Sequence, residues 1–102
     1  MALQPKNSPI FMKIQWNSKA RSDLAGVMEF LGKESHNIGQ QKAKKILASV
    51  RHLQNMPRIG LQFAEFAPRE IRRILIEQYE VRYEIKENTV IILRIRHTRE
   101  HR

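Results

Sequence analysis

The spacing of apolar residues changes partway along this chain, and that change limits the fold more than any other feature. Before Pro57 most apolar residues recur at the three- and four-residue intervals of a helix with one buried face. From Ile71 onwards they alternate with charged residues, as in strands that bury one side. A short alternating stretch, residues 11–16, precedes the helical part. The pattern therefore predicts a helical layer packed on a sheet whose strands come largely from the second half.

Two helices joined by a short polar turn, residues 34–37, are expected before Pro57. The oxygen of Asn17 or Ser18 can cap the first helix, and Gly32 is a plausible stop. Pro57 and Gly60 end the second. The apolar positions are Ala20, Leu24, Val27, Met28 and Leu31 in the first helix, and Ala43, Ile46, Leu47, Val50 and Leu53 in the second.

Three strands are expected at residues 71–76, 79–86 and 89–97, with a tight turn at Glu87-Asn88 between the last two. With the strand at 11–16, the order is β-α-α-β-β-β. This predicts an α+β fold, a helical hairpin packed on a mainly antiparallel four-stranded sheet. Residues 1–11, which contain Pro5 and Pro9, are expected to form a flexible leader, and residues 12–102 a single domain.

Positive charge is the first indication of function. The chain of 102 residues carries a formal net charge of +9. Residues 39–58 contribute five of the cations (Lys42, Lys44, Lys45, Arg51 and Arg58) and contain no Asp or Glu. Such a field favours nucleic acid, an acidic protein partner or an anionic surface.

Several function classes are excluded or disfavoured by composition. The chain has no cysteine, which excludes disulfides, thiolate chemistry and Cys-based zinc sites. It contains no apolar run of signal-peptide or membrane-spanning length. A soluble cytoplasmic protein with no membrane partner is expected.

Arginines gather on one face of the predicted sheet. If Ile91, Leu93, Ile95 and His97 face the helices, Arg94 and Arg96 face outwards beside Arg82. Arg72 or Arg73 on the next strand adds one more cation. Guanidinium groups there can hold phosphates or carboxylates by paired hydrogen bonds. Glu80 and Glu84 share the face of Arg82, so cross-strand ion pairs account for part of the cluster.

Together, three groups of residues resemble the RelE/ParE superfamily of toxins. Residues 12–24 (M-K-I-Q-W-N-S-K-A-R-S-D-L) resemble the opening strand and first helix. Pro57-Arg58-Ile59-Gly60 resembles the P-x-x-G that follows the second helix, and residues 71–74, 79–85 and 90–99 resemble the three-strand end. The resemblance covers about residues 12–100 and implies the toxin half of a bacterial type II toxin–antitoxin pair, neutralised by an acidic antitoxin.

The resemblance implies one of two activities, and neither needs a cofactor or metal. RelE-like members cut messenger RNA on the ribosome, whereas ParE-like members poison DNA gyrase. RelE-like nucleases usually carry Arg after the Tyr that opens the second of the three strands, but here Tyr79 is followed by Glu80. They also commonly have a Tyr near the C-terminus, and this chain has none there. The tail from His97 is similar to the H-x-R-R ending of ParE-like members, except that Glu100 stands where the pattern has its last Arg. The ParE-like branch is therefore favoured.

The nuclease alternative stays open, with His97 as general base or acid and Arg72 and Arg99 as phosphate clamps. A lone His at a strand end is more often structural. A metal bound by His97, Glu100 and His101 is disfavoured because the residues do not follow the H-E-x-x-H order. A toxin fold that has lost activity and survives as a binding module is a third possibility. The candidate target- or phosphate-binding residues are Arg72, Arg73, Arg82, Arg94, Arg96 and Arg99.

Overall fold

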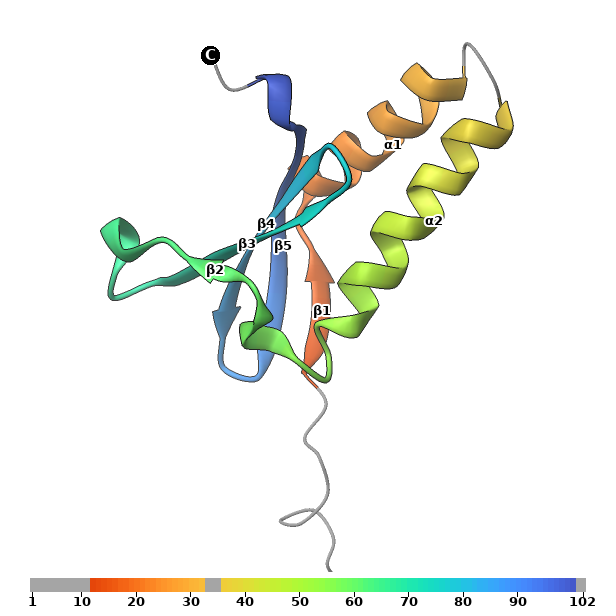
Figure 1. The fold of residues 1–102 in the computed structure, drawn as a ribbon. Coiled ribbons are helices and arrows are strands. Elements are labelled where there is room, and N and C mark those ends of the chain that lie inside the picture. Colours follow the sequence, from red (N-terminus) through yellow and green to blue (C-terminus); the bar gives the residue numbers. More distant parts are fainter. Residues whose placement is uncertain (1–11, 33–35, 101–102) are drawn as a thin grey trace, which may run out of the picture.

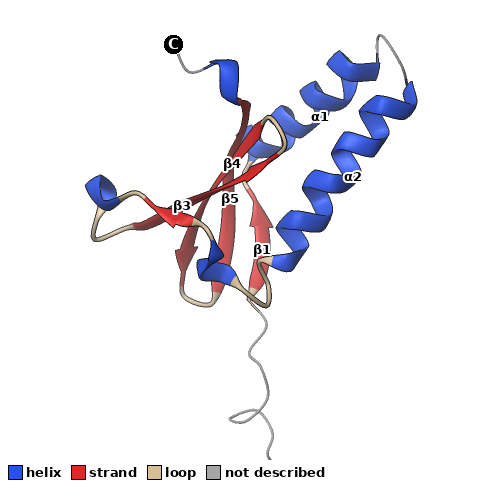
Figure 2. Cartoon of the chain, viewed as in Figure 1, coloured by secondary structure: helices blue, strands red, loops and turns tan. Residues whose placement is uncertain are grey.

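The computed structural model describes residues 12–32 and 36–100, so the expected leader at residues 1–11 lies outside the described residues. Helices and strands follow the predicted order, with one short strand added (Figure 2). The elements are β1 Lys13–Trp16, α1 Ser18–Gly32, α2 His36–His52, η1 Pro57–Ile59, β2 Leu61–Gln62, η2 Ala64–Phe66, β3 Glu70–Ile76, β4 Tyr79–Lys86, β5 Thr89–His97 and η3 Thr98–Glu100.

The two helices lie side by side and cover one face of a five-stranded sheet (Figure 1). The strand order is β1-β5-β4-β3-β2, with β1 parallel to β5 and the other neighbours antiparallel. The α+β class and the helical hairpin on a mainly antiparallel sheet are confirmed. The sheet has five strands rather than the predicted four. The additional strand, β2, pairs only Leu61 and Gln62 with β3, so it is too short for an alternating sequence pattern to reveal.

Local chemistry sets the ends of the elements. The side-chain oxygen of Asn17 accepts the backbone N–H of Ala20 at 2.8 Å, so Asn17 caps α1 as one of the two predicted candidates. Glu87 and Asn88 both have positive φ, 51° and 61°, which is the conformation of a two-residue turn between antiparallel strands. These two features fix where α1 begins and how β4 returns as β5.

The core lies between the helices and the inner face of the sheet. Tyr79 and Tyr83 belong to it, and Tyr83 is fully buried. Trp16 is partly buried and packs against the same cluster. The other buried members are Met12, Ala20, Val27, Ile46, Val50, Leu53, Val81, Ile85, Val90, Ile92 and Ile95.

A bulge in β5 corrects the predicted division of its two faces. Tyr83 is opposite Ile92, but the preceding residue Arg82 is opposite Arg94, so Leu93 is an extra residue. Val90 and Ile92 are buried before the bulge and Ile95 is buried after it. The prediction that Ile91, Leu93, Ile95 and His97 share the helix-facing side is therefore wrong, because alternation is interrupted at Leu93.

Candidate functional site

Three predicted arginines form a row across the sheet. Arg73 on β3 is opposite Arg82 on β4, which is opposite Arg94 on β5. On β4, Arg82 lies on the same face as Glu80, opposite to the face of the core tyrosines Tyr79 and Tyr83. Its cross-strand partners Arg73 and Arg94 share that face. The structure thus brings together Arg73, Arg82 and Arg94, which the sequence assigned to one surface.

A buried carboxylate holds two members of this row. The side chain of Glu80 is only 5% exposed and lies 3.6 Å from Arg73 and 3.4 Å from Arg82. The guanidinium of Arg82 also lies over the ring of Phe63, 4.4 Å from its centre. The two arginines therefore already have a counter-charge, and one has an aromatic partner as well.

Arg94 has a carboxylate partner from the helical layer. Its Nε donates to Oδ2 of Asp23, on α1, at 2.9 Å. Arg96 is opposite Glu80 in the β4–β5 register, and its side chain makes no ion pair or hydrogen bond with another described residue. Arg96 is thus the cation of this surface that the fold leaves available to a partner.

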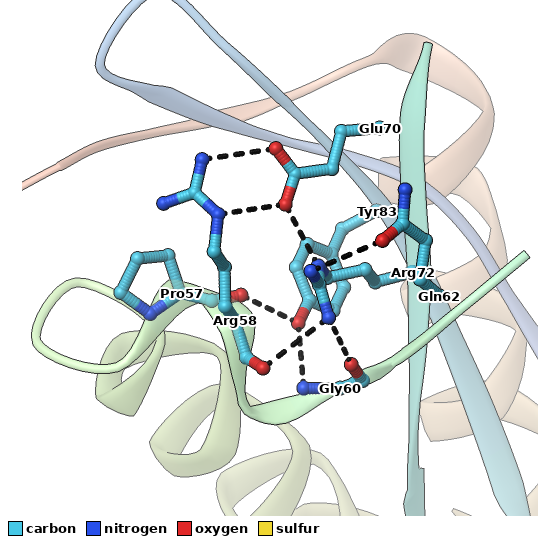
Figure 3. Close-up of polar contacts among 7 residues, drawn as sticks. All are labelled: Pro57, Arg58, Gly60, Gln62, Glu70, Arg72 and Tyr83. Carbon is cyan, nitrogen blue, oxygen red and sulfur yellow. Dashed lines mark hydrogen bonds and ion pairs between the residues drawn. The ribbon is translucent and has the colours of Figure 1, made fainter. Parts of the chain in front are cut away.

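Arg72 points to the other side of β3 and fastens a loop (Figure 3). Its Nη1 donates to the carbonyl oxygen of Gly60 at 2.7 Å, and its Nε donates to the carboxylate of Glu70 at 2.9 Å. Glu70 also accepts two hydrogen bonds from Arg58. The side chain of Arg72 is 15% exposed, so the structure places it away from the arginine row, inside a network that holds residues 57–62.

Tyr83 completes this network from the core. Its hydroxyl donates to the carbonyl oxygen of Pro57 at 2.7 Å and accepts the N–H of Gly60 at 3.0 Å (Figure 3). Burial raises the pKa of the Tyr83 hydroxyl. Burial alone would raise the pKa of Glu70 too, but the hydrogen bonds from Arg58 and Arg72 outweigh it and the net pKa is lowered. The P-x-x-G segment is therefore fixed to the sheet.

A further ion pair, which the sequence pattern did not predict, involves Glu84 near the end of β4. Arg69 donates to both carboxylate oxygens of Glu84, at 3.1 and 2.8 Å. These hydrogen bonds lower the pKa of Glu84. Glu84 therefore serves Arg69 rather than Arg82, which pairs with Glu80.

His97 is held by its own chain. Its Nδ1 accepts the backbone N–H of Arg99 at 3.1 Å, and its ring packs edge-on against Tyr79, 5.2 Å between centres. Nδ1 is therefore occupied, so a contact of the ring with a substrate would have to be made by Nε2.

His97 and Arg99 border a hollow of about 560 Å³ between α1 and the end of β5, here called the C-terminal groove. Its apolar lining includes Phe30, which is 68% exposed. The groove thus combines an apolar lining with one arginine, Arg99, at its end and one carboxylate, Asp23. The residues that define it are Asp23, Val27, Phe30, Tyr79, Ile95, His97 and Arg99.

Comparison with known proteins identifies the family. Residues 14–102 match the family described as "ParE toxin of type II toxin-antitoxin system, parDE". The chain belongs to the ParE toxin family. It is the toxin of a type II toxin–antitoxin system, as the sequence resemblance implied.

This ParE-family toxin is similar to one curated protein in sequence and to one solved structure in fold. It is 27% identical over 85 residues to Toxin RelE2 of Caulobacter vibrioides, covering 83% of this chain and 93% of that protein. The solved structure described as "Chromosomal ParDE TA system from P. aeruginosa" superposes with a TM-score of 0.72 at 22% identity. That match covers 88% of this chain and 98% of the solved one, and it shows the same fold.

Among residues 12–32 and 36–100, no group of His, Asp and Glu is arranged to hold a metal ion in this toxin. His101, one of the residues considered for such a site, lies outside the described residues. No helix in the described part of the chain is long and apolar enough to span a bilayer.

The predicted site residues fall into three places. Arg73, Arg82, Arg94 and Arg96 belong to β3, β4 and β5, His97 and Arg99 border the C-terminal groove, and Arg72 fastens the P-x-x-G loop. Reasoning from the sequence missed Asp23 and Phe63, the partners of Arg94 and Arg82. Asp23 lies in the segment 12–24 that resembles the family's opening strand and first helix, but it is 71 residues from its partner, so no local pattern could connect them.

Proposed function

We propose that this toxin arrests growth by poisoning DNA gyrase, performs no chemistry of its own, and is held inactive by an acidic antitoxin. One observation carries the choice of target. Arg72, one of the two phosphate clamps of the nuclease alternative, is already paired with Glu70. Three further candidate phosphate-binding arginines are also paired with carboxylates: Arg73 and Arg82 with Glu80, and Arg94 with Asp23.

The state of His97 supports the same conclusion. A general base must offer a free nitrogen within hydrogen-bonding reach of the proton that it removes. Nδ1 of His97 is occupied by the N–H of Arg99. Accepting a proton at Nδ1 would cost this hydrogen bond, which opposes a role in cutting RNA.

The surface that remains for a protein target is the end of β5. Arg99, which follows β5, borders the C-terminal groove together with the exposed ring of Phe30, and Arg96 lies on β5 opposite Glu80. Cations next to an exposed aromatic residue are typical of protein–protein contact surfaces. We place the contact with gyrase here, and the toxin would act in the cytoplasm, where gyrase works.

Charge supports the acidic antitoxin. The net charge of +9 would speed the approach of an acidic chain and make binding sensitive to salt.

The test is a supercoiling assay with purified gyrase, relaxed plasmid and purified toxin. We expect supercoiling to fall as toxin is added, and to be preserved when the toxin is first incubated with its antitoxin. Arg96→Ala and Arg99→Ala should each require at least about tenfold more toxin, because about 1.4 kcal/mol of lost contact is tenfold in affinity. Unchanged supercoiling at a molar excess of toxin would sink the gyrase proposal.

Ribosome-dependent cleavage of messenger RNA is the second candidate, and two observations favour it. The chain is similar to Toxin RelE2, and His97, Tyr79 and Arg99 gather at one groove. Pulse-labelling within minutes of induction separates the two activities. An early fall in DNA synthesis supports the gyrase target, whereas an early fall in protein synthesis with cut transcripts would replace it and make His97→Ala the first substitution.

A further inference from the structure

The turn between β3 and β4, residues 77 and 78, is bonded both to the helical layer and to the C-terminal end of the chain (Figure 1). Glu77 has a positive φ of 56°, and its side chain is 31% exposed. Lys42 and Lys45 of α2 both bind its carboxylate, one at each oxygen. Because the two lysines are three residues apart, they lie on one face of the helix and reach the same acceptor. Two ion pairs to one carboxylate therefore tie the turn to α2.

The other residue of the turn holds the end of β5. The carbonyl oxygen of Gln78 accepts the N–H of Thr98, the first residue of η3, at 2.8 Å. Tyr79, which follows in β4, is opposite His97, and the two rings pack edge-on. Nδ1 of His97 in turn accepts the N–H of Arg99. The position of the backbone that carries Arg99 thus depends on where the turn lies.

The carboxylate is the part of this connection that a side-chain substitution removes. The bond from Thr98 to Gln78 joins two backbone groups, so it survives a change of side chain at residue 77 as long as the turn stays in place. Exposed ion pairs contribute little to global stability. Two of them from a rigid helix nevertheless restrain a two-residue turn, because they limit both its distance from the helix and its direction. The ion pairs of Glu77 are thus suited to fixing a position rather than to holding the fold together.

We propose that Glu77 is a positioning residue: held by two lysines of α2, it fixes the β3–β4 turn and so sets the position of Arg99 at the C-terminal groove. This inference rests on the proposed contact of Arg99 with gyrase. Glu77 does not touch the target, and its effect reaches η3 through the backbone of the turn.

Two variants remove the ion pairs from opposite sides. Glu77→Asn keeps the turn, because Asn tolerates a positive φ, and Lys42→Gln with Lys45→Gln removes the same pairs from the helix. The first makes the chain more positive and the second less so, which means that a shared effect does not come from net charge. Lys44→Gln with Arg51→Gln is the matched control, because it removes two exposed cations of α2 that form no ion pair with another described residue. Urea unfolding checks that all three variants fold.

Amide hydrogen exchange at Thr98 and Arg99 measures the positioning without gyrase. We expect both amides to exchange about two- to fivefold faster in Glu77→Asn and in the double lysine variant, and at the wild-type rate in the control. The N–H of Ile95, which Asp23 holds, should exchange as in wild type, because loosening of the turn does not break that bond. A purely structural role of Glu77 would speed exchange at Ile95 as well.

The supercoiling assay tests the consequence for the target. Glu77→Asn and the double lysine variant should each require about two- to fivefold more toxin than wild type, and the control should require the wild-type amount. Wild-type inhibition by Glu77→Asn, wild-type exchange at η3, or equally faster exchange at Ile95 would each overturn the inference while leaving the gyrase proposal intact. If the wild-type chain leaves supercoiling unchanged, the gyrase proposal fails, and exchange at Thr98 and Arg99 alone decides whether Glu77 positions η3.

Discussion

The carboxylate of Asp23, on α1, accepts the backbone N–H of Ile95, on β5, at 2.8 Å. The last pair between β1 and β5 is Trp16 with Ile92, so β5 runs past the end of its neighbour. Because β1 does not extend as far as Ile95, the carboxylate of Asp23 takes the place of a β1 carbonyl as the acceptor of the Ile95 N–H. The same oxygen accepts from Nε of Arg94 at 2.9 Å. One helix residue thus fixes both the backbone and an arginine just beyond the bulge at Leu93.

Removing this carboxylate should destabilise the toxin. Asp23→Ala leaves the N–H of Ile95 without its acceptor, which costs about 1–3 kcal/mol of unfolding free energy. Asp23→Asn should cost less, because its amide oxygen still accepts that N–H, although the charge opposite Arg94 is lost. Urea unfolding measures both. Ser22→Ala, at the exposed neighbouring position, is the control and should stay within about 0.5 kcal/mol of wild type. Equal midpoints for Asp23→Ala and wild type would contradict the role of this bond.

Two glycines should respond in opposite directions to alanine. A Cβ on Gly60 would lie 2.5 Å from the Tyr83 hydroxyl oxygen and 2.6 Å from the carbonyl oxygen of Arg73, so backbone must shift. Gly60→Ala should cost about 1–3 kcal/mol or more. Gly26, within α1, has nothing within 4 Å of such an atom. Gly26→Ala should stabilise by about 0.5–1 kcal/mol, because alanine loses less backbone freedom in a helix. Thermal melts compare the pair directly, and a stabilised Gly60→Ala would show that the P-x-x-G loop is not fixed as described.

Alternation of apolar and charged residues predicted both ends of β4, because the two faces of that strand keep a strict period of two. It failed in β5, where Leu93 is inserted without any Gly or Pro to mark the bulge. The family resemblance and the total charge indicated a toxin. Neither could show that Arg72 turns inwards, because its partners Gly60 and Glu70 become neighbours only when the loop folds back on β3. The sequence alone could not predict which arginine pairs with which distant carboxylate.

Acid should destabilise the toxin through two carboxylates. Folding lowers the pKa of Glu70 and Glu84 below the ordinary value of 4.5. The unfolded chain therefore takes up protons first, so their stabilisation is present above about pH 4.5 and is lost as the pH falls through the folded pKa values. The double variant Glu70→Gln, Glu84→Gln should be less stable at pH 7 and should lose less stability than wild type on acidification. Glu65→Gln, at an exposed position with no ion pair among the described residues, is the control. An unchanged acid limb in the double variant would contradict this account.

Arg72 and Arg96 should separate a structural role from a target contact. Arg72→Ala removes hydrogen bonds to Glu70 and to Gly60 from a mostly buried network, so it should cost about 2 kcal/mol of stability. Arg96→Ala removes the same charge from a residue without a partner in the described structure, so its stability should stay within about 0.5 kcal/mol of wild type. Gyrase inhibition, measured where both variants are folded, should fall in Arg96→Ala and persist in Arg72→Ala. A fully stable Arg72→Ala that has lost inhibition would instead make Arg72 part of the target surface.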